Sequence, residues 1–206
     1  MTRRFSGSIL VLASHNPKKL DELRALMAPS GVEVRSAAEL GLEEPEEPAP
    51  DFVGNAAIKA LAAATASGLP ALADDSGLAV SGLDGAPGVL SARWAGPDKD
   101  YAAAMQHVTG GLAQRFGSFA AADKRAAFLT VICLAWPDGE TACVEGRIDG
   151  TLIEQPRGNA GFGYDPIFVP EGESRSFAEL TPEEKAAISH RGRAMRAILE
   201  ACFTAN

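Results

Sequence analysis

The sequence has few cysteines, and their number and spacing exclude two classes of protein. Only three occur among the 206 residues, at positions 133, 143 and 202. They lack the spacing of a zinc site, and an odd number argues against a disulfide framework. Because Cys133 and Cys143 lie in apolar segments that resemble strands, the sequence predicts that they are buried free thiols.

Positive charge and long apolar runs are also scarce. The formal net charge is −8, which argues against binding to nucleic acid or to an acidic membrane surface. An anionic substrate would therefore need a local cluster of cations or a metal ion. No apolar run is long enough to cross a bilayer, and the run at residues 9–13 is shorter than a signal-peptide core. We expect a cytoplasmic protein with no nucleic-acid or membrane partner.

Two common nucleotide-binding signatures are absent from the sequence. Neither the Gly-x-x-x-x-Gly-Lys-Ser/Thr pattern of a P-loop nor a Gly-x-Gly-x-x-Gly opening a helix occurs. The composition is otherwise normal for a globular protein with a core, at 46% hydrophobic and 22% charged residues. A chain of this length can form one large domain or two lobes that share a sheet.

Hydrophobic patterning predicts alternating strands and helices early in the chain and a hairpin later. Strands are expected at residues 8–14, 32–35, 71–74, 78–80, 126–136 and 141–148. Helices are expected from 17 to a stop at 29–31, at 51–67, at 98–108, after a capping box at 181–184, and from 189 to about 203. Residues 82–96 and 158–166 should be glycine-rich loops, and 137–139 the hairpin turn.

The pattern of elements predicts one mixed domain. Without a visible repeat or separable linker, residues 1–206 are expected to form a single domain. Early strand–helix alternation and a late hairpin require a mixed sheet, so the predicted class is α/β (mixed α+β), with a cleft between the sheet and a helical lobe.

Two adjacent carboxylates stand out in the first half of the chain. The segment Asp74-Asp75-Ser76-Gly77 follows a short apolar run at residues 69–73. Mg²⁺ prefers carboxylate oxygens and often keeps waters and substrate phosphates as its other ligands. The same four residues also suit a turn, so this segment alone leaves both a metal site and an ordinary turn open.

Cationic side chains lie where two helices are expected to begin. Ser14-His15-Asn16-Pro17-Lys18-Lys19 follows a buried strand, and a helix N-terminus with polar donors is an anion site. Further along, Asn55 and Lys59 share a helix face just after an acidic loop with Glu46 and Glu47. A glutamate there could complete a metal site with Asp75. Solvated lysines and a solvated acidic loop are the alternatives.

Two segments near the C-terminus have the chemistry to recognise a heterocycle. Gly161-Phe162-Gly163-Tyr164-Asp165-Pro166 offers aromatic rings, close backbone approach and an acceptor carboxylate. Ser189-His190-Arg191, with Lys185 upstream, supplies donors for a carbonyl oxygen or a phosphate. The alternatives are a glycine-rich turn whose aromatics cover the core, and a structural histidine.

Taken together, these segments resemble the family of inosine triphosphate pyrophosphatases. The matches occur in one order over nearly the whole chain, at residues 14–19, 55–59, 73–80, 85–88 with 91–93, 161–166 and 180–191. The resemblance implies an elongated mixed β-sheet with flanking helices and two lobes around a central cleft. It also implies cleavage of the α–β phosphoanhydride of inosine, deoxyinosine and xanthosine triphosphates, with Mg²⁺ as cofactor and a homodimeric assembly.

The resemblance carries site roles onto matching positions. Triphosphate binding is implied for Ser14, His15, Asn16, Pro17, Lys18, Lys19 and Lys59, with Ser76 touching the substrate. Glu47 and Asp75 are the implied Mg²⁺ ligands, Asp75 is the implied catalytic proton acceptor, and Asp74 supports them. The implied base pocket contains Phe162, Gly163, Tyr164, Asp165, Lys185, His190 and Arg191.

The match has small departures, and two other functions are compatible with the residues. Trp94 stands where the family motif leads us to expect tyrosine, and the motif varies at positions 15, 17 and 18, which favours backbone roles there. One alternative is a related enzyme acting on pyrimidine or modified nucleoside triphosphates. The other is a nucleotide-binding regulatory module without catalysis, which the combination of Asp75, Glu47 and Lys19 disfavours.

Overall fold

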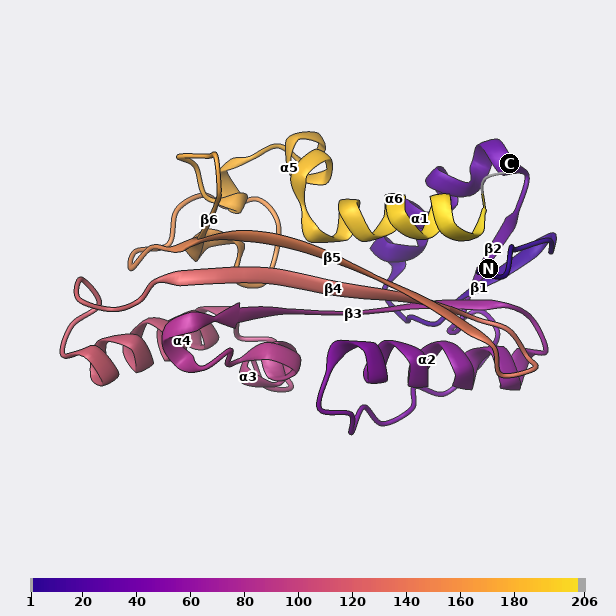
Figure 1. Ribbon diagram of the computed structural model, residues 1–206, viewed down its shortest axis with the longest axis horizontal. Helices are drawn as coiled ribbons and strands as arrows, with labels where there is room; N and C mark the ends of the chain where they lie inside the picture. The colour runs from indigo at the N-terminus through magenta and orange to yellow at the C-terminus, as the bar shows by residue number, and fades with distance from the viewer. Residues whose placement is uncertain (1, 204–206) are drawn as a thin grey trace. The chain divides into compact units, whose positions relative to one another are not determined.

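The computed structural model describes residues 2–203, except the side chain of Lys18. The described residues form a six-stranded sheet with strand order β2-β1-β3-β4-β5-β6 (Figure 1). The strands are β1 Ile9–Leu12, β2 Glu33–Ser36, β3 Ala71–Val80, β4 Arg125–Ala135, β5 Thr141–Leu152 and β6 Phe168–Pro170. The helices are α1 Pro17–Met27, α2 Phe52–Ser67, α3 Ser91–Trp94, α4 Tyr101–Phe116, α5 Pro182–Ile188 and α6 His190–Cys202.

The sheet is mixed, as the sequence predicts. Strand β1 pairs in parallel with β2, where Ile9 lies opposite Glu33, and with β3, where Val11 lies opposite Ala71. Strand β6 pairs antiparallel with β5. A tight turn after Trp136 joins β4 to β5, with the Trp136 N–H donating to Glu140 O at 2.9 Å. The predicted hairpin is therefore confirmed.

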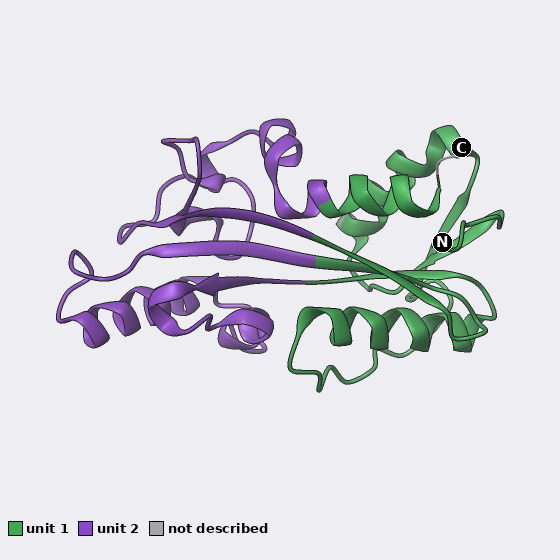
Figure 2. Cartoon of the chain, in the orientation of Figure 1, with its two compact units in different colours: residues 1–75, 131–145, 194–206 green, residues 76–130, 146–193 purple. Residues whose placement is uncertain are grey.

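The chain divides into two compact units (Figure 2). Unit 1 contains residues 1–75, 131–145 and 194–206, and unit 2 contains residues 76–130 and 146–193. Three of the boundaries fall inside β3, β4 and β5.

In unit 1, helices cover both faces of the strands. Helix α1 and the part of α6 from Ala194 onward pack on one face, through Leu20, Leu23, Met27, Ala194 and Ile198 against Leu10, Leu12 and Leu72. Helix α2 packs on the other face, through Ala56, Ala60, Ala63 and Ala64 against Val11, Ala71 and Ala73. Because alanine side chains are short, α2 can approach the strands closely.

Unit 2 has an aromatic core. Phe128 of β4 meets Phe168 of β6 edge-on, with ring centroids 4.7 Å apart, and both rings contact Phe177. Helix α4 closes this core with Val108 and Leu112, which are fully buried.

Local signals place most helix ends correctly. Asp51 caps α2 by accepting the Gly54 N–H at 2.7 Å, and Gly68 ends the helix in the left-handed conformation. Thr181 forms the predicted capping box with Glu184, and Ser189 accepts the Gly192 N–H at the start of α6. No helix within residues 2–203 is both long and apolar enough to traverse a membrane.

Several sequence expectations are wrong. Residues 71–80 form one strand rather than two, so Asp74 to Gly77 continue β3 and the turn interpretation fails. Helix α4 begins at Tyr101 rather than at 98 and continues to Phe116. The expected loop at 82–96 contains α3 and two turns of 3₁₀ helix, and β6 was not expected. Pairing with neighbouring strands overrides the local turn preference in β3 and allows a strand as short as β6.

The prediction for two of the cysteines is also wrong. Cys133 and Cys143 form a disulfide, and only Cys133 is buried. The two residues stand three positions before Trp136 and three after Glu140, the pair that closes the hairpin turn, so the antiparallel register places them opposite each other. Their Cα atoms are 4.0 Å apart. Cys202 is a buried free thiol.

Candidate active site

The two adjacent carboxylates lie in the middle of β3, where alternation sends them to opposite faces. Successive residues of a strand point to opposite sides of a sheet. Asp74 therefore points to the face covered by α1, and Asp75 to the face covered by α2. Their side chains are only 9% and 10% exposed. Each carboxylate meets a lysine from the helix on its own side.

On the α1 side, Lys19 binds Asp74. The Lys19 ammonium donates to both carboxylate oxygens, with Nζ–Oδ1 and Nζ–Oδ2 distances of 2.7 and 2.9 Å. Helix α1 begins at Pro17, directly after the loop that leaves β1, so Lys19 lies in its first turn. The lysine for which the family resemblance implies phosphate binding therefore neutralises the Asp74 carboxylate in this structure.

The rest of the 14–19 segment is held by local contacts. The Ser14 hydroxyl oxygen accepts the Asn16 N–H at 3.1 Å. The exposed His15 ring lies 2.8 Å from a Glu44 carboxylate oxygen and 3.1 Å from Leu42 O. The hydrogen bond to Glu44 raises the His15 pKa. His15 thus ties the end of β1 to the acidic loop, a contact that the sequence does not reveal.

On the α2 side, Lys59 lies between Glu47 and Asp75. Its Nζ is 2.6 Å from Glu47 Oε1 and 3.7 Å from Asp75 Oδ1, and the lysine side chain is 15% exposed. Burial lowers the Lys59 pKa, but the hydrogen bond to Glu47 and the charge of Asp75 outweigh it, so the pKa is raised. The lysine is therefore a cation held among carboxylates. The structure brings together the glutamate, aspartate and lysine that the sequence singles out.

These carboxylates fit Mg²⁺ better than a metal that needs a full protein cage. Within residues 2–203, no three His, Cys, Asp or Glu side chains form a cluster able to hold a metal ion. Mg²⁺ is commonly bound through one or two carboxylates, with waters and substrate phosphates completing its shell. Glu47 and Asp75 already share one cationic neighbour, which marks the space near them as favourable for positive charge.

In unit 2, the predicted base-recognition loop wraps around Asp165. The Asp165 carboxylate accepts the Phe162 N–H at 2.8 Å and a short contact from Lys185 Nζ. A Cβ on Gly161, whose φ is +74°, would lie 2.1 Å from Asp165 Oδ2, so only glycine allows the loop to close. Burial raises the Asp165 pKa, although Lys185 acts in the opposite direction.

Aromatic rings flank Lys185. Its ammonium lies 4.9 Å from the Phe162 ring centroid and 5.2 Å from that of Phe177. Phe162 is 64% exposed, which is unusual for so large an apolar side chain. The exposed Phe162 ring can stack on a flat heterocycle, and the Lys185 ammonium beside it can donate a hydrogen bond to the edge of that heterocycle.

Three other predicted base-pocket residues differ in their surroundings. Tyr164 is buried in the core of unit 2, where its hydroxyl donates to Ser91 O at 2.9 Å and burial raises its pKa. His190 is buried and stacks on Phe128, with ring centroids 4.9 Å apart. Arg191 follows in the first turn of α6 and is half-buried. The Tyr164 and His190 rings are therefore packed inside unit 2 rather than exposed as Phe162 is.

Two residues near the predicted site escaped the sequence analysis. Thr130 is fully buried in β4, and its hydroxyl oxygen lies 2.5 Å from that of Ser76. Phe177 contacts the Lys185 ammonium from the core side. The detectable signal for Thr130 is a lone hydroxyl in the apolar run at 126–136, whereas Phe177 carries no signal that separates it from other core rings.

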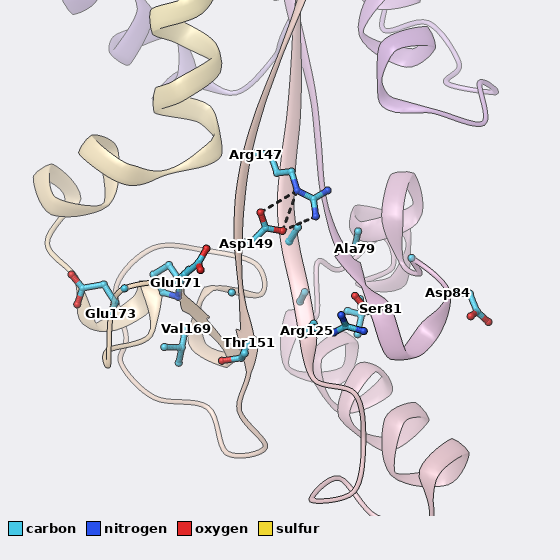
Figure 3. Close-up of a pocket in the computed structure, with 17 residues that line it drawn as sticks. Ala79, Ser81, Asp84, Arg125, Arg147, Asp149, Thr151, Val169, Glu171 and Glu173 are labelled. Atoms are coloured by element: carbon cyan, nitrogen blue, oxygen red, sulfur yellow. Dashed lines mark hydrogen bonds and ion pairs between the residues drawn. The ribbon is translucent and has the colours of Figure 1, made fainter.

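A cavity lies elsewhere in unit 2 (Figure 3). Its volume is about 870 Å³, and its lining includes Arg125, Arg147, Asp149, Thr151 and Glu171. Arg147 and Asp149 pair with each other there, with an Nη2–Oδ1 distance of 2.6 Å. None of the predicted site residues lines this cavity, so we do not assign it to the substrate.

Comparison with known proteins gives consistent matches over nearly the full chain. The family model described as the Ham1 family matches residues 10–201. A dITP/XTP pyrophosphatase of Gluconobacter oxydans is 59% identical over 204 residues, which cover 98% of this chain and 95% of that protein. A dITP/XTP pyrophosphatase of Bradyrhizobium diazoefficiens is 53% identical over 210 residues, covering 98% of this chain and 99% of that protein.

Solved structures agree with this result. A HAM1 protein from Coxiella burnetii superposes with a TM-score of 0.87 at 41% identity, covering 93% of this chain and 96% of that chain. A nucleoside-triphosphatase (dITP/XTP pyrophosphatase) from Mycobacterium abscessus gives a TM-score of 0.76 at 46% identity, covering 93% of this chain and 98% of that chain. The fold class and the family resemblance inferred from the sequence are confirmed, and the chain belongs to the Ham1 family.

Proposed function

We propose that this protein hydrolyses inosine, deoxyinosine and xanthosine triphosphates to the monophosphate and pyrophosphate in a Mg²⁺-dependent reaction. The observation that carries the proposal is the Glu47–Lys59–Asp75 cluster, in a chain whose relatives over 98% of its length are named dITP/XTP pyrophosphatases. Removing such nucleotides would cleanse the cellular nucleotide pool.

At the phosphate end, the residues of unit 1 would neutralise negative charge. Lys59, Lys19 and the backbone N–H groups of the segment around residues 14–19 would bind the triphosphate. Glu47 and Asp75 would hold Mg²⁺, and Asp74 would hold Lys19 on the opposite face of β3. When bound, the metal would supply charge neutralisation at the phosphates and a lowered pKa for coordinated water.

Asp75 would act as the proton acceptor. It would take a proton from the attacking water while the water oxygen forms a bond to a phosphorus of the α–β anhydride. The bridging P–O bond would break, and its electron pair would stay on the leaving group, which is pyrophosphate if the α-phosphorus is attacked and the monophosphate if the β-phosphorus is attacked. General-base assistance of this kind contributes roughly 10²–10⁴-fold to the rate.

The residues of unit 2 would recognise the hydrogen-bonding groups along the edge of the purine base. Inosine and xanthosine carry an oxygen at position 6, where adenosine carries an amine. Donors such as Lys185 or Arg191 could donate a hydrogen bond to that oxygen. In adenine the same donor would meet the amine, which is itself a donor, so the site would reject adenine. Guanine shares the 6-oxo group, so its exclusion would depend on its 2-amino group.

A panel of triphosphates, assayed for pyrophosphate release with and without Mg²⁺, tests this function. We expect the kcat/KM for inosine and xanthosine triphosphates to exceed those for ATP, GTP and UTP, and turnover to require the metal. Equal turnover of ATP or UTP would contradict recognition of the purine edge. Preference for a pyrimidine triphosphate would favour the related enzyme class, and binding without turnover would favour a regulatory module.

We also propose that the protein is a cytoplasmic homodimer, which the family resemblance supports. Light scattering should give twice the chain mass of 21.4 kDa, and a monomer would contradict the assembly. The location has a separate test, cell fractionation, because the Cys133–Cys143 disulfide is unusual for a compartment where thiols are kept reduced. Recovery of the protein outside the cytoplasmic fraction would contradict the location.

A further inference from the structure

Asn55, in the first turns of α2, has a side chain whose burial is difficult to explain by stability. It is 0% exposed. Its Oδ1 accepts the backbone N–H of Ala49 at 3.0 Å, while its buried Nδ2 has no hydrogen-bond partner within residues 2–203. A buried donor without a partner destabilises a folded protein. An apolar side chain would avoid that cost, so the amide is retained for what its oxygen does.

The contact at Ala49 is close and is supported by a second residue. A Cβ on Gly54 would lie 2.6 Å from the Ala49 Cβ, so the acidic loop can rest on the helix only because position 54 is glycine. Gly54 lies inside α2, where glycine is unfavourable compared with alanine. Asn55 and Gly54 are therefore both unfavourable for the stability of the helix, and both are needed to hold the loop at Ala49.

Seating the loop at Ala49 positions Glu47, which lies two residues earlier. Asn55 and Lys59 are one helical turn apart and face the same side of α2. Asn55 holds the backbone at Ala49, and Lys59 binds the Glu47 carboxylate at 2.6 Å. The ion pair alone would not keep Glu47 in place, because the same ammonium is expected to bind phosphate.

We propose that Asn55 is a positioning residue, which holds the 43–50 loop so that Glu47 stays ready to bind a divalent cation together with Asp75. This role rests on the proposed function, in which Glu47 and Asp75 hold Mg²⁺. Residues that orient a metal ligand typically change metal affinity about 10- to 100-fold when they are replaced. Such residues raise the metal affinity because a ligand side chain that is already held in place loses less conformational freedom when the metal binds.

Asn55→Leu, which removes both the oxygen and the unpaired donor at similar volume, is the first variant. Mn²⁺ alone, a paramagnetic substitute that carboxylates also bind, would be titrated into the nucleotide-free protein and followed by water-proton relaxation. We expect the Mn²⁺ dissociation constant to rise about 10- to 100-fold. The Ala49 amide should exchange its hydrogen faster, and the thermal midpoint should stay level or rise.

Gly54→Ala is the second variant, because it disturbs the same contact without touching Asn55. Gly110→Ala is its matched control, since Gly110 also lies within a helix and its Cβ would meet nothing within 4 Å. We expect weaker Mn²⁺ binding for Gly54→Ala and wild-type binding for Gly110→Ala. In the activity assay, Asn55→Leu and Gly54→Ala should both need more Mg²⁺ for half-maximal turnover, and their kcat should return to the wild-type value at saturating metal.

Three results would overturn the role of Asn55. The first is an unchanged Mn²⁺ affinity in both Asn55→Leu and Gly54→Ala. The second is an unchanged rate of hydrogen exchange at the Ala49 amide in Asn55→Leu. The third is a parallel fall of metal affinity and thermal midpoint, which would make Asn55 a purely structural residue. Failure of the wild-type protein to bind Mn²⁺ would instead remove the metal site and, with it, the proposed function.

Discussion

Both units contain a lysine held by a carboxylate, but the two pairs have different surroundings. In unit 1, Lys59 lies between two carboxylates, and their charge raises its pKa. In unit 2, Lys185 has one carboxylate partner, Asp165, and two phenylalanine rings beside it. There the burial of Asp165 raises the pKa of the acid instead.

The difference matches the two roles that we propose for these ion pairs, phosphate binding in unit 1 and base recognition in unit 2. Acidic residues outnumber the lysine in the first cluster, so a further cation is favourable there and a phosphate can replace a carboxylate as the partner of Lys59. The second cluster is balanced in charge and lined by flat apolar surfaces, which suits a neutral heterocycle with a polar edge. The surroundings of each lysine, rather than the lysine itself, distinguish the two clusters.

The largest effect is expected from Asp75→Asn, which keeps the shape of the side chain but removes its charge and basicity. Turnover should fall by at least roughly 10²-fold, because both base catalysis and metal binding are weakened. Circular dichroism and thermal unfolding should show an intact fold. Activity near the wild-type level would remove Asp75 from the mechanism.

A smaller effect is expected from Gly161→Ala in the loop of unit 2. The new Cβ would collide with the Asp165 carboxylate, and the positive φ alone costs about 1–2 kcal/mol. Gly172→Ala is the matched control, because Gly172 also has a positive φ, +86°, but open space around it. Stability should fall in both variants, whereas selectivity for inosine triphosphate over ATP should fall only in Gly161→Ala. Equal selectivity in the two variants would separate the loop from base recognition.

Thr130→Val should have a moderate effect, because it replaces a buried hydroxyl by a methyl group of similar size. Loss of the contact with the Ser76 hydroxyl should cost about 1 kcal/mol in stability. A double-mutant cycle with Ser76→Ala would measure the coupling between the two hydroxyls in both unfolding and kcat. Additive effects would show that Thr130 does not orient Ser76.

The smallest effect concerns pH. The hydrogen bond to Glu44 raises the His15 pKa, so this contact stabilises the folded protein fully below the unfolded-state pKa of 6.5. That contribution is lost as the pH rises through the higher folded-state pKa. Both groups are exposed, so the change in stability should be slight. NMR titration of the His15 ring should show the raised pKa, and Glu44→Gln should return it to its ordinary value.

How far the sequence predicts this structure depends on the range of the interactions involved. Helix α2 was predicted closely because its cap at Asp51 and its stop at Gly68 are local signals. The sequence does not predict that β3 is continuous, because residues 74–77 locally favour a turn and only pairing with neighbouring strands keeps them extended. The Cys133–Cys143 bond was missed because it depends on the register of the hairpin.

The candidate site shows the same limit. The sequence motifs predict that Lys19, Lys59, Asp74 and Asp75 belong to the site, but they do not predict which lysine binds which carboxylate. That pairing follows from strand alternation in β3, which places Asp74 beside α1 and Asp75 beside α2. The core position of Tyr164 depends in turn on Ser91, a partner 73 residues away in the sequence.

The most direct test compares Lys59→Met with Lys185→Met, using the ratio of kcat/KM for inosine triphosphate to that for ATP. We predict that Lys59→Met lowers both kcat/KM values by a similar factor and leaves the ratio near that of the wild type. Lys185→Met should lower the ratio strongly, by roughly 10-fold or more, since a charged hydrogen bond to the 6-oxo group is lost. A collapse of the ratio in Lys59→Met, or an unchanged ratio in Lys185→Met, would contradict the division of roles between the two clusters.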